Sequence, residues 1–333
     1  MKRALKAVGN PWGQRITLFV IICVVMAVAQ PLFLRPANAM SIILAISVTG
    51  IMACGMLFTI IVGGIDFSVA SMAGISAAIS FSVAQSYGFS DAGFLYGCAL
   101  ALGLCLVVGW VNGFITTTFG IPAFVVTLAM KNLLYGCIYF VLRGFYVYIP
   151  QVGLVFHFGS ANILGVPMPV IVFVILLIIC AFVLGKTTYG RRLYVIGGNK
   201  NVATLAGVST KLAVRSAYMI SSVLAGIGGI LLASMNGQAG MPTAVGYEGN
   251  VLMAMVVGGI NLAGGEGGIP GTVFGALFVG IINNIMLLLS VSSDYQKLVQ
   301  GAIILAAMIL NVFAKRGTTR AIIIRRKPKM EKV

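Results

Sequence analysis

One acidic side chain of this sequence stands in an apolar setting. Asp66 is one of only six acidic residues among 333, and it ends a glycine-broken stretch, residues 62–65 (Val-Gly-Gly-Ile). Residues 257–260 repeat the same four residue types and are followed by Asn261. Membrane proteins place polar side chains at such helix breaks where a solute path crosses lipid. The two copies favour an internally duplicated transport protein whose chemistry is noncovalent recognition.

Two carboxylates each allow two interpretations. Asp66 can line or gate a path, or it can cap the next helix by accepting bonds from the amides of its first turn. Glu248 precedes another apolar run, and a helix cap or an anchor at the membrane surface is the favoured interpretation there. The cap and the path are compatible roles for Asp66, so both stay open.

Lys131 lies near the middle of an apolar run, where its amine cannot easily reach the membrane surface. It can pair with an acid such as Asp66, or the span can be displaced toward the cytoplasm. We favour the displaced span.

Other side chains that could do chemistry do not form a catalytic set. His157 is the only histidine, and the six cysteines lie in apolar runs without a C-x-x-C pair. No phosphate-binding loop is present, so the similarity of residues 262–266 to the signature pentapeptide of ATP-hydrolysing transporter subunits is a coincidence. We therefore expect no enzyme, no metal site and no cofactor bound by this chain.

Composition indicates an integral membrane protein. Hydrophobic residues make up 60% of the chain and charged residues 8%, and the mean hydropathy is +1.07. In soluble proteins, hydrophobic residues make up roughly 45–50% of the chain and charged residues roughly 25%. The apolar runs are continuous over ~20 residues, which fits helices and not the alternating ~10-residue strands of a barrel. The expected fold class is all-α, with about ten transmembrane helices, glycine-broken short or half helices and an internal repeat.

The ten expected spans agree with the distribution of charge. They lie near residues 16–34, 41–62, 67–84, 93–117, 122–142, 166–185, 212–234, 248–262, 269–291 and 296–313. The first resembles a secretory signal but is too long, so an uncleaved span is expected. Most of the 22 basic residues fall in residues 1–15, 186–215 and 315–332, and cytoplasmic segments collect such residues. If the chain starts on the cytoplasmic side, six spans return it there at residue 186. Four more spans return it there again at residue 315, so all three basic segments are cytoplasmic.

The basic segment 186–211 contains a second feature. Asn199 can cap a short helix that ends at Gly207. A short cytosolic helix between glycines suits docking of another protein, whereas a plain connecting loop is the alternative.

The sequence resembles the membrane permeases of bacterial ABC sugar importers, of the ribose, arabinose, xylose, galactose and autoinducer-2 type. The resemblance covers roughly residues 41–313. Residues 63–68 match the family's GGIDLS, and residues 121–128 match IPxFIxTL. Residues 190–199 match its G-R-x-x-x-A-I-G-G-N loop, and residues 256–265 match VVxGGxxLxGG. Gly271-Thr272 and Asn283-Asn284 continue the pattern.

This resemblance implies one permease domain over residues 1–333, in the bacterial inner membrane, with a cytoplasmic N-terminus (1–15), coupling loop (186–211) and basic tail (314–333). The implied partners are a cytosolic ABC ATPase that uses ATP, a periplasmic sugar-binding protein, a second identical or different permease, and the lipid bilayer, but no nucleic acid. The residues expected to shape or gate the pathway are Gly63, Gly64, Asp66, Ser68, Glu248, Asn250 and Asn261. The residues expected to couple to the ATPase are Gly197, Gly198, Asn199, Asn201, Ala203, Leu205 and Gly207.

Some residues depart from the family pattern. Residues 200–203 replace the usual Pro-Glu-Ala-Ala, residues 248–250 replace Glu-Leu-Asp, and Lys131 stands where relatives are apolar. The sugar therefore stays open. Two other functions remain as alternatives: a transporter driven by an ion gradient, and a membrane scaffold that transports nothing.

Overall fold

The computed structural model describes residues 11–326, and nearly all of its regular structure is α-helix. Seven of the described helices are long and apolar enough to cross a membrane. They are α3 (Pro36–Ile61), α4 (Val69–Ser86), α5 (Asp91–Phe119), α6 (Ala123–Leu142), α8 (Met168–Lys186), α11 (Thr210–Asn236) and α13 (Ile269–Leu288). The expected class, an all-α membrane protein, is confirmed.

The remaining helices are shorter or less apolar. They are α2 (Pro11–Ala29), the 3₁₀ turn η1 (Pro31–Leu34), α7 (Gly153–Ser160), α9 (Thr188–Gly198), α10 (Lys200–Leu205), α12 (Tyr247–Val257) and α14 (Ser293–Arg326). Of the basic segments expected at the termini, residues 1–10 and 327–333 lie outside the described residues. Residues 11–15 and 314–326 are helical, in α2 and α14.

The chain divides into two compact units. Residues 36–284 form the larger one, and residues before 36 and after 284 form the smaller. In the smaller unit, α2 is followed directly by η1, which Pro31 begins, and the described part ends in the long helix α14. All residues expected to carry function lie in the larger unit.

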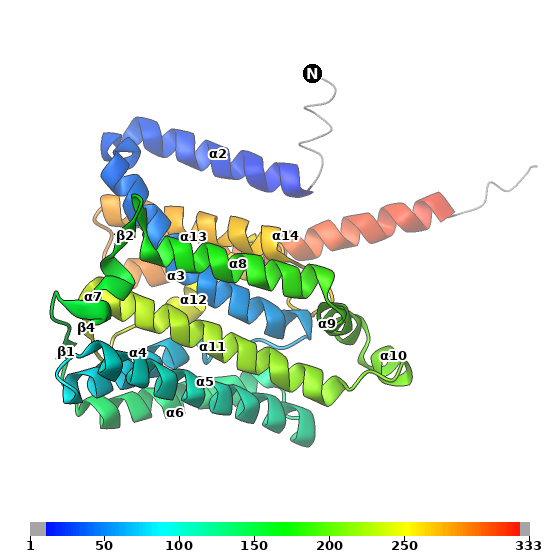
Figure 1. Ribbon diagram of the computed structural model, residues 1–333. Helices are drawn as coiled ribbons and strands as arrows, with labels where there is room; N and C mark the ends of the chain where they lie inside the picture. The colour runs from blue at the N-terminus through cyan, green and yellow to red at the C-terminus, as the bar shows by residue number, and fades with distance from the viewer. Residues whose placement is uncertain (1–10, 327–333) are drawn as a thin grey trace, which may run out of the picture. The chain divides into compact units, whose positions relative to one another are not determined.

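Three helices form the core of the larger unit. The apolar stretches of α3, α4 and α11 are 83%, 72% and 72% buried, whereas those of α5, α6 and α8 are 33%, 28% and 22% buried. α11 packs against α3, α4 and α5, while α6 packs on α4 and α8 packs on α3 (Figure 1). The less buried helices therefore present their apolar sides outward, as lipid-facing helices do.

Small residues let these helices approach closely. A β-carbon on Gly229 of α11 would overlap the backbone of Ala73 in α4. A β-carbon on Gly109 of α5 would lie 2.6 Å from the carbonyl oxygen of Tyr218 in α11. Without side chains at these points the backbones gain packing contacts that larger residues would prevent.

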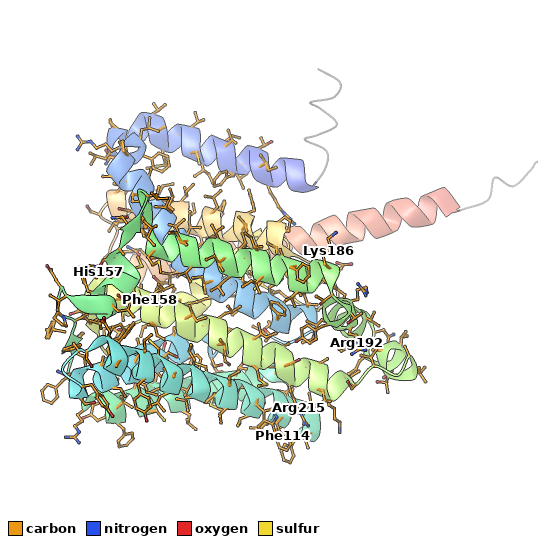
Figure 2. The ribbon with its side chains drawn as sticks, in the orientation of Figure 1. Phe114, His157, Phe158, Lys186, Arg192 and Arg215 are labelled. Carbon is orange, nitrogen blue, oxygen red and sulfur yellow. The ribbon has the colours of Figure 1, made fainter. Side chains whose placement is uncertain are left out.

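The two ends of the larger unit differ in structure and charge. α9 and α10 lie at one end, together with the labelled basic residues Lys186, Arg192 and Arg215 (Figures 1 and 2). The other end carries α7, with His157 and Phe158, and two small antiparallel sheets (Figure 2). We call these the basic end and the opposite end.

The opposite end contains structure that the sequence did not indicate. The expected spans end at residue 142 and resume at residue 166, but between them β1 (Val147–Tyr148) pairs with β4 (Gln238–Ala239), and α7 follows β1. β2 (Asn162–Ile163) pairs with β3 (Val166–Pro167). Two-residue strands have no detectable sequence period, and the partner of β1 lies far along the chain. Pairing satisfies backbone groups that the short segments alone could not.

Candidate functional site

Three glycine-rich segments meet at the basic end. The amide of Gly265 donates to the carbonyl oxygen of Ile61, the last residue of α3, at 2.9 Å. A β-carbon on Gly264 would lie 2.8 Å from the amide nitrogen of Gly63. The connections α3–α4 and α12–α13 are therefore in backbone contact, and the two glycine-broken stretches lie at the same end of the larger unit.

The end of α9 completes this contact. A β-carbon on Gly197 would overlap the carbonyl oxygen of Ile61 and come too close to the amide of Gly265. Nothing lies within 4 Å of the same position on Gly198. We call Gly63, Gly197, Gly198, Gly264 and Gly265 the glycine junction. Only residues without side chains allow three backbones to approach this closely.

A tyrosine fastens α9 to the junction from the side. The hydroxyl of Tyr194 donates to the carbonyl oxygen of Gly267 at 2.8 Å. Burial raises the pKa of this phenol, so it stays a protonated donor at neutral pH. α9 is thus tied to the α12–α13 connection by a side chain as well as by backbone.

The short helix expected after Asn199 is present as α10. The Asn199 side chain accepts from the amides of Asn201 at 2.9 Å and Val202 at 3.1 Å, and Gly207 has a φ of +74° just beyond the helix. Helix start and stop therefore follow the cap residue and the glycine that the sequence indicated. The helix itself ends at Leu205, and Gly197 and Gly198 belong to α9.

α10 exposes two large apolar side chains. Leu205 is 89% exposed and Val202 is 55% exposed, while Ala203 is fully buried against the rest of the unit. α10 lies at the basic end, and large apolar side chains are seldom this exposed there without a purpose. They mark a surface that another protein can cover.

Asp66 lies in a fully buried polar cluster close to the glycine junction. Its carboxylate accepts from the amide and hydroxyl of Ser68, at 3.0 and 2.5 Å, and from the hydroxyl of Ser221 in α11, at 2.8 Å. Asn112 of α5 donates to the Ser68 hydroxyl at 3.2 Å. All four side chains are essentially inaccessible. We call these four residues the Asp66 cluster. It joins the α3–α4 connection to α5 and α11.

Asp66 is not the N-cap residue of α4, because Ser68 occupies that position. The Asp66 carboxylate does accept the amide of Ser68 at the start of α4, and it also bonds to α11. A second bond holds the same connection to α6, because Thr127 donates to the carbonyl oxygen of Ile65 at 3.0 Å. Three neighbouring helices therefore fix the position of this connection.

Asn261 stabilises its own loop. Its side-chain amide donates to the carbonyl oxygen of Gly264 at 3.0 Å, and its side-chain oxygen accepts from the amide of Ala263 at 3.3 Å. Both of these hydrogen bonds lie within the α12–α13 connection, and neither involves Asp66. Its contribution is to shape the glycine-rich turn that meets Gly63.

Glu248 lies in the first turn of α12 and forms an ion pair with Lys131 of α6. The capping interpretation of Glu248 is wrong, because Gly246 is the N-cap of α12. α6 covers the residues expected for the fifth span, and the amine of Lys131 is paired within it. An acid does neutralise Lys131, but it is Glu248 and not Asp66.

The predicted pathway residues thus fall into two groups along α12. Asn261 follows the end of α12, at the glycine junction, whereas Glu248 and Asn250 lie in its first turns, roughly 16 Å away along the helix axis. There Asn283 of α13 donates to the side-chain oxygen of Asn250 at 3.1 Å.

Sequence reasoning missed several residues of these groups. Asn112 and Ser221 belong to the Asp66 cluster, Tyr194 to the glycine junction, and Asn283 to the α12 group. A polar residue inside an apolar run is a usable signal, and it applies to Asn112. The partner of each residue lies far along the chain, so the clusters themselves could not be assembled from spacing.

Comparison with known proteins shows which family this chain belongs to. Residues 38–308 match the family described as "Branched-chain amino acid transport system / permease component". The chain is 36% identical to the L-arabinose transport system permease protein of Escherichia coli, with 93% of each chain covered. It is 32% identical to the ribose import permease protein of Bacillus subtilis, over 90% of this chain and 92% of that one. It is 34% identical to the ribose import permease protein of Escherichia coli, over 89% of this chain and 92% of that one.

No solved structure matches the chain at a comparable level of significance. The family match covers most of the sequence, and it includes every cluster described above. With seven helices able to span a membrane, this chain is a multi-pass membrane protein and belongs to that family of transport-system permeases.

Proposed function

We propose that this chain is the transmembrane permease subunit of an ATP-driven importer for a pentose or a related small carbohydrate. The family description names amino acids, but the relatives that align over about nine-tenths of the chain are named for L-arabinose and ribose. Transport by such a subunit needs no covalent chemistry, so no cofactor is assigned to this chain. ATP is used by the partner subunit.

The glycine junction is the observation that carries this proposal. It brings the end of α9 into backbone contact with the connections α3–α4 and α12–α13. A displacement of α9 must therefore move the start of α4 and the end of α12, since no flexible side chain lies between them. This geometry suits a protein in which a partner that displaces α9 opens and closes a path between the helices.

α10 is the proposed contact with the ATPase. The residues assigned to coupling are Gly197, Gly198, Asn199, Asn201, Ala203, Leu205 and Gly207. Asn199 holds α10 directly after α9, and α10 exposes Leu205 and Val202. A partner that binds Leu205 and Val202 would move α10 and α9, and the movement of α9 would displace the glycine junction.

Replacing Leu205 by glutamate is expected to abolish copurification of the ATPase, because a charge would enter an apolar contact. The permease itself should keep its melting temperature within about 2 °C, since an 89% exposed side chain supports no core. Leu164→Glu at the opposite end is the matched control: Leu164 is fully exposed and should tolerate the charge. Equal recovery of ATPase with both variants would remove α10 from the docking surface.

The membrane topology follows from the basic end. Placing α9 and α10 in the cytoplasm satisfies the preference of Lys and Arg for that side. We assign ten spans by adding α2, α12 and α14 to the seven long apolar helices, which places both termini in the cytoplasm and the protein in the inner membrane. α12, with 11 residues, is too short to cross alone and acts as a half helix.

The opposite end is then the periplasmic face, where a sugar-binding protein would dock. A second permease, identical or different, would complete the pore. We infer one permease domain with an internal repeat, in which Gly63, Gly64, Asp66 and Ser68 belong to one half and Asn261 to the other. In this proposal they gate the path from the cytoplasmic side, while Glu248 and Asn250 face it nearer the midplane.

A further inference from the structure

The ion pair between Lys131 and Glu248 lies at mid-depth in the larger unit. Lys131 is the ninth of the twenty residues of α6, and Glu248 lies in the first turn of the half helix α12. The two side chains remain partly reachable, at 22% and 16% exposure. Ionised groups at this depth are costly, and they are found where a polar path requires them.

Two polar atoms beside the pair have no partner among the described residues. They are Oε2, the second carboxylate oxygen of Glu248, and the hydroxyl of Tyr135. Tyr135 stands one helical turn after Lys131 on the same face of α6, and the Glu248 carboxylate acts on it electrostatically. Buried polar atoms are nearly always hydrogen-bonded, so two orphans around one ion pair indicate a missing partner.

A carboxamide lies on the other side of α12 from the pair. Asn250 follows Glu248 by two residues, roughly 200° around the helix axis, and its side-chain oxygen accepts from Asn283 of α13. Asn250 therefore holds α12 to α13, while Glu248 bonds to α6. The start of a half helix with an acid, an amine and a phenol around it is a typical solute site of membrane transporters.

We propose that Glu248, Lys131 and Tyr135 form a binding station for an uncharged polyhydroxylated solute midway along the path. Sugar hydroxyls donate and accept at once, so one can donate to Glu248 Oε2 while others accept from the Lys131 amine and bond to the Tyr135 hydroxyl. The two charges of the pair sum to zero, so the station carries no net charge and suits a neutral solute. This inference rests on the function proposed above and assigns its solute contacts.

The test uses the complete importer in proteoliposomes, with ATP hydrolysis and uptake measured together. The probe is whichever of L-arabinose, D-ribose or D-xylose the wild type accumulates fastest, with the loaded binding protein in excess. Glu248→Gln should lower uptake at least tenfold and Tyr135→Phe about threefold, while stimulated ATP hydrolysis stays within twofold of wild type. Tyr139→Phe is the matched control, because Tyr139 lies one turn further along α6 and is exposed; it should transport as the wild type does.

Three results would overturn the station. The first is wild-type uptake by both Glu248→Gln and Tyr135→Phe. The second is uptake and hydrolysis falling together by the same factor. The third is recovery of uptake in the charge-reversed double variant Lys131→Glu/Glu248→Lys, which would make the pair a fastener between α6 and α12. Failure of the proposed function looks different, because the wild type itself would then move none of the three sugars.

Discussion

Replacing Gly197 by alanine is expected to lower ATP-driven uptake at least tenfold. The added β-carbon would overlap the carbonyl oxygen of Ile61 and crowd the amide of Gly265, both backbone atoms that cannot rotate away. Overpacking of this kind typically costs about 1–3 kcal/mol, whereas alanine in a helix otherwise gains up to about 1 kcal/mol over glycine. The strain falls on the contact through which α9 would move α3 and α12. Uptake per membrane-inserted permease is the quantity to measure.

Gly185→Ala is the matched control for this prediction. Gly185 lies near the end of α8, the helix that precedes α9, and no atom lies within 4 Å of the position of its β-carbon. It should keep uptake within twofold of wild type. If the two alanine variants transported equally well, the glycine junction would not be a mechanical contact.

Asp66→Ala should insert into the membrane normally yet lose at least nine-tenths of its uptake. Insertion depends on the apolar spans, which the change leaves alone. The fold loses the common acceptor of Ser68 and Ser221, and leaving buried donors unmatched costs about 1–3 kcal/mol each. The melting temperature in detergent should fall by several degrees, because the α3–α4 connection is no longer held to α11. Membrane quantity, melting temperature and uptake together check this prediction.

Two milder variants separate the acceptor from the charge. Ser221→Ala removes one donor and leaves the Asp66 carboxylate with two hydrogen bonds. The free energy of unfolding should therefore fall by about 1 kcal/mol. Asp66→Asn keeps the shape and one acceptor oxygen, and its stability should lie between wild type and alanine. Wild-type uptake by Asp66→Ala would remove this residue from the mechanism.

The long helices of this protein could be predicted because each is a continuous apolar run, and some helix starts could be predicted from local signals. α6 begins after Pro122 and α10 begins after Asn199, as proline and cap chemistry require. The glycine-broken ends of α3 and α12 were equally visible, because a pair of glycines interrupts each run. These are local features, and the structure retains them.

The partners of the charged residues could not be predicted, because they depend on which helices lie side by side. Lys131 and Glu248 are separated by more than a hundred residues, and no local pattern links them. The same holds for Asp66 and Ser221. For each acid, the sequence offered a helix cap as the local explanation, but the structure supplies a distant partner for both. Tertiary packing overrode the local preference.

The central claim is that this chain passes a sugar across the membrane when a partner hydrolyses ATP. It is tested most directly in proteoliposomes that contain the copurified importer, with radiolabelled L-arabinose, D-ribose or D-xylose on the side of the binding protein. One of these sugars should accumulate only when ATP and the loaded binding protein are both present. Accumulation by the permease alone, driven by a proton or sodium gradient, or no flux of any sugar through the assembled complex, would contradict it.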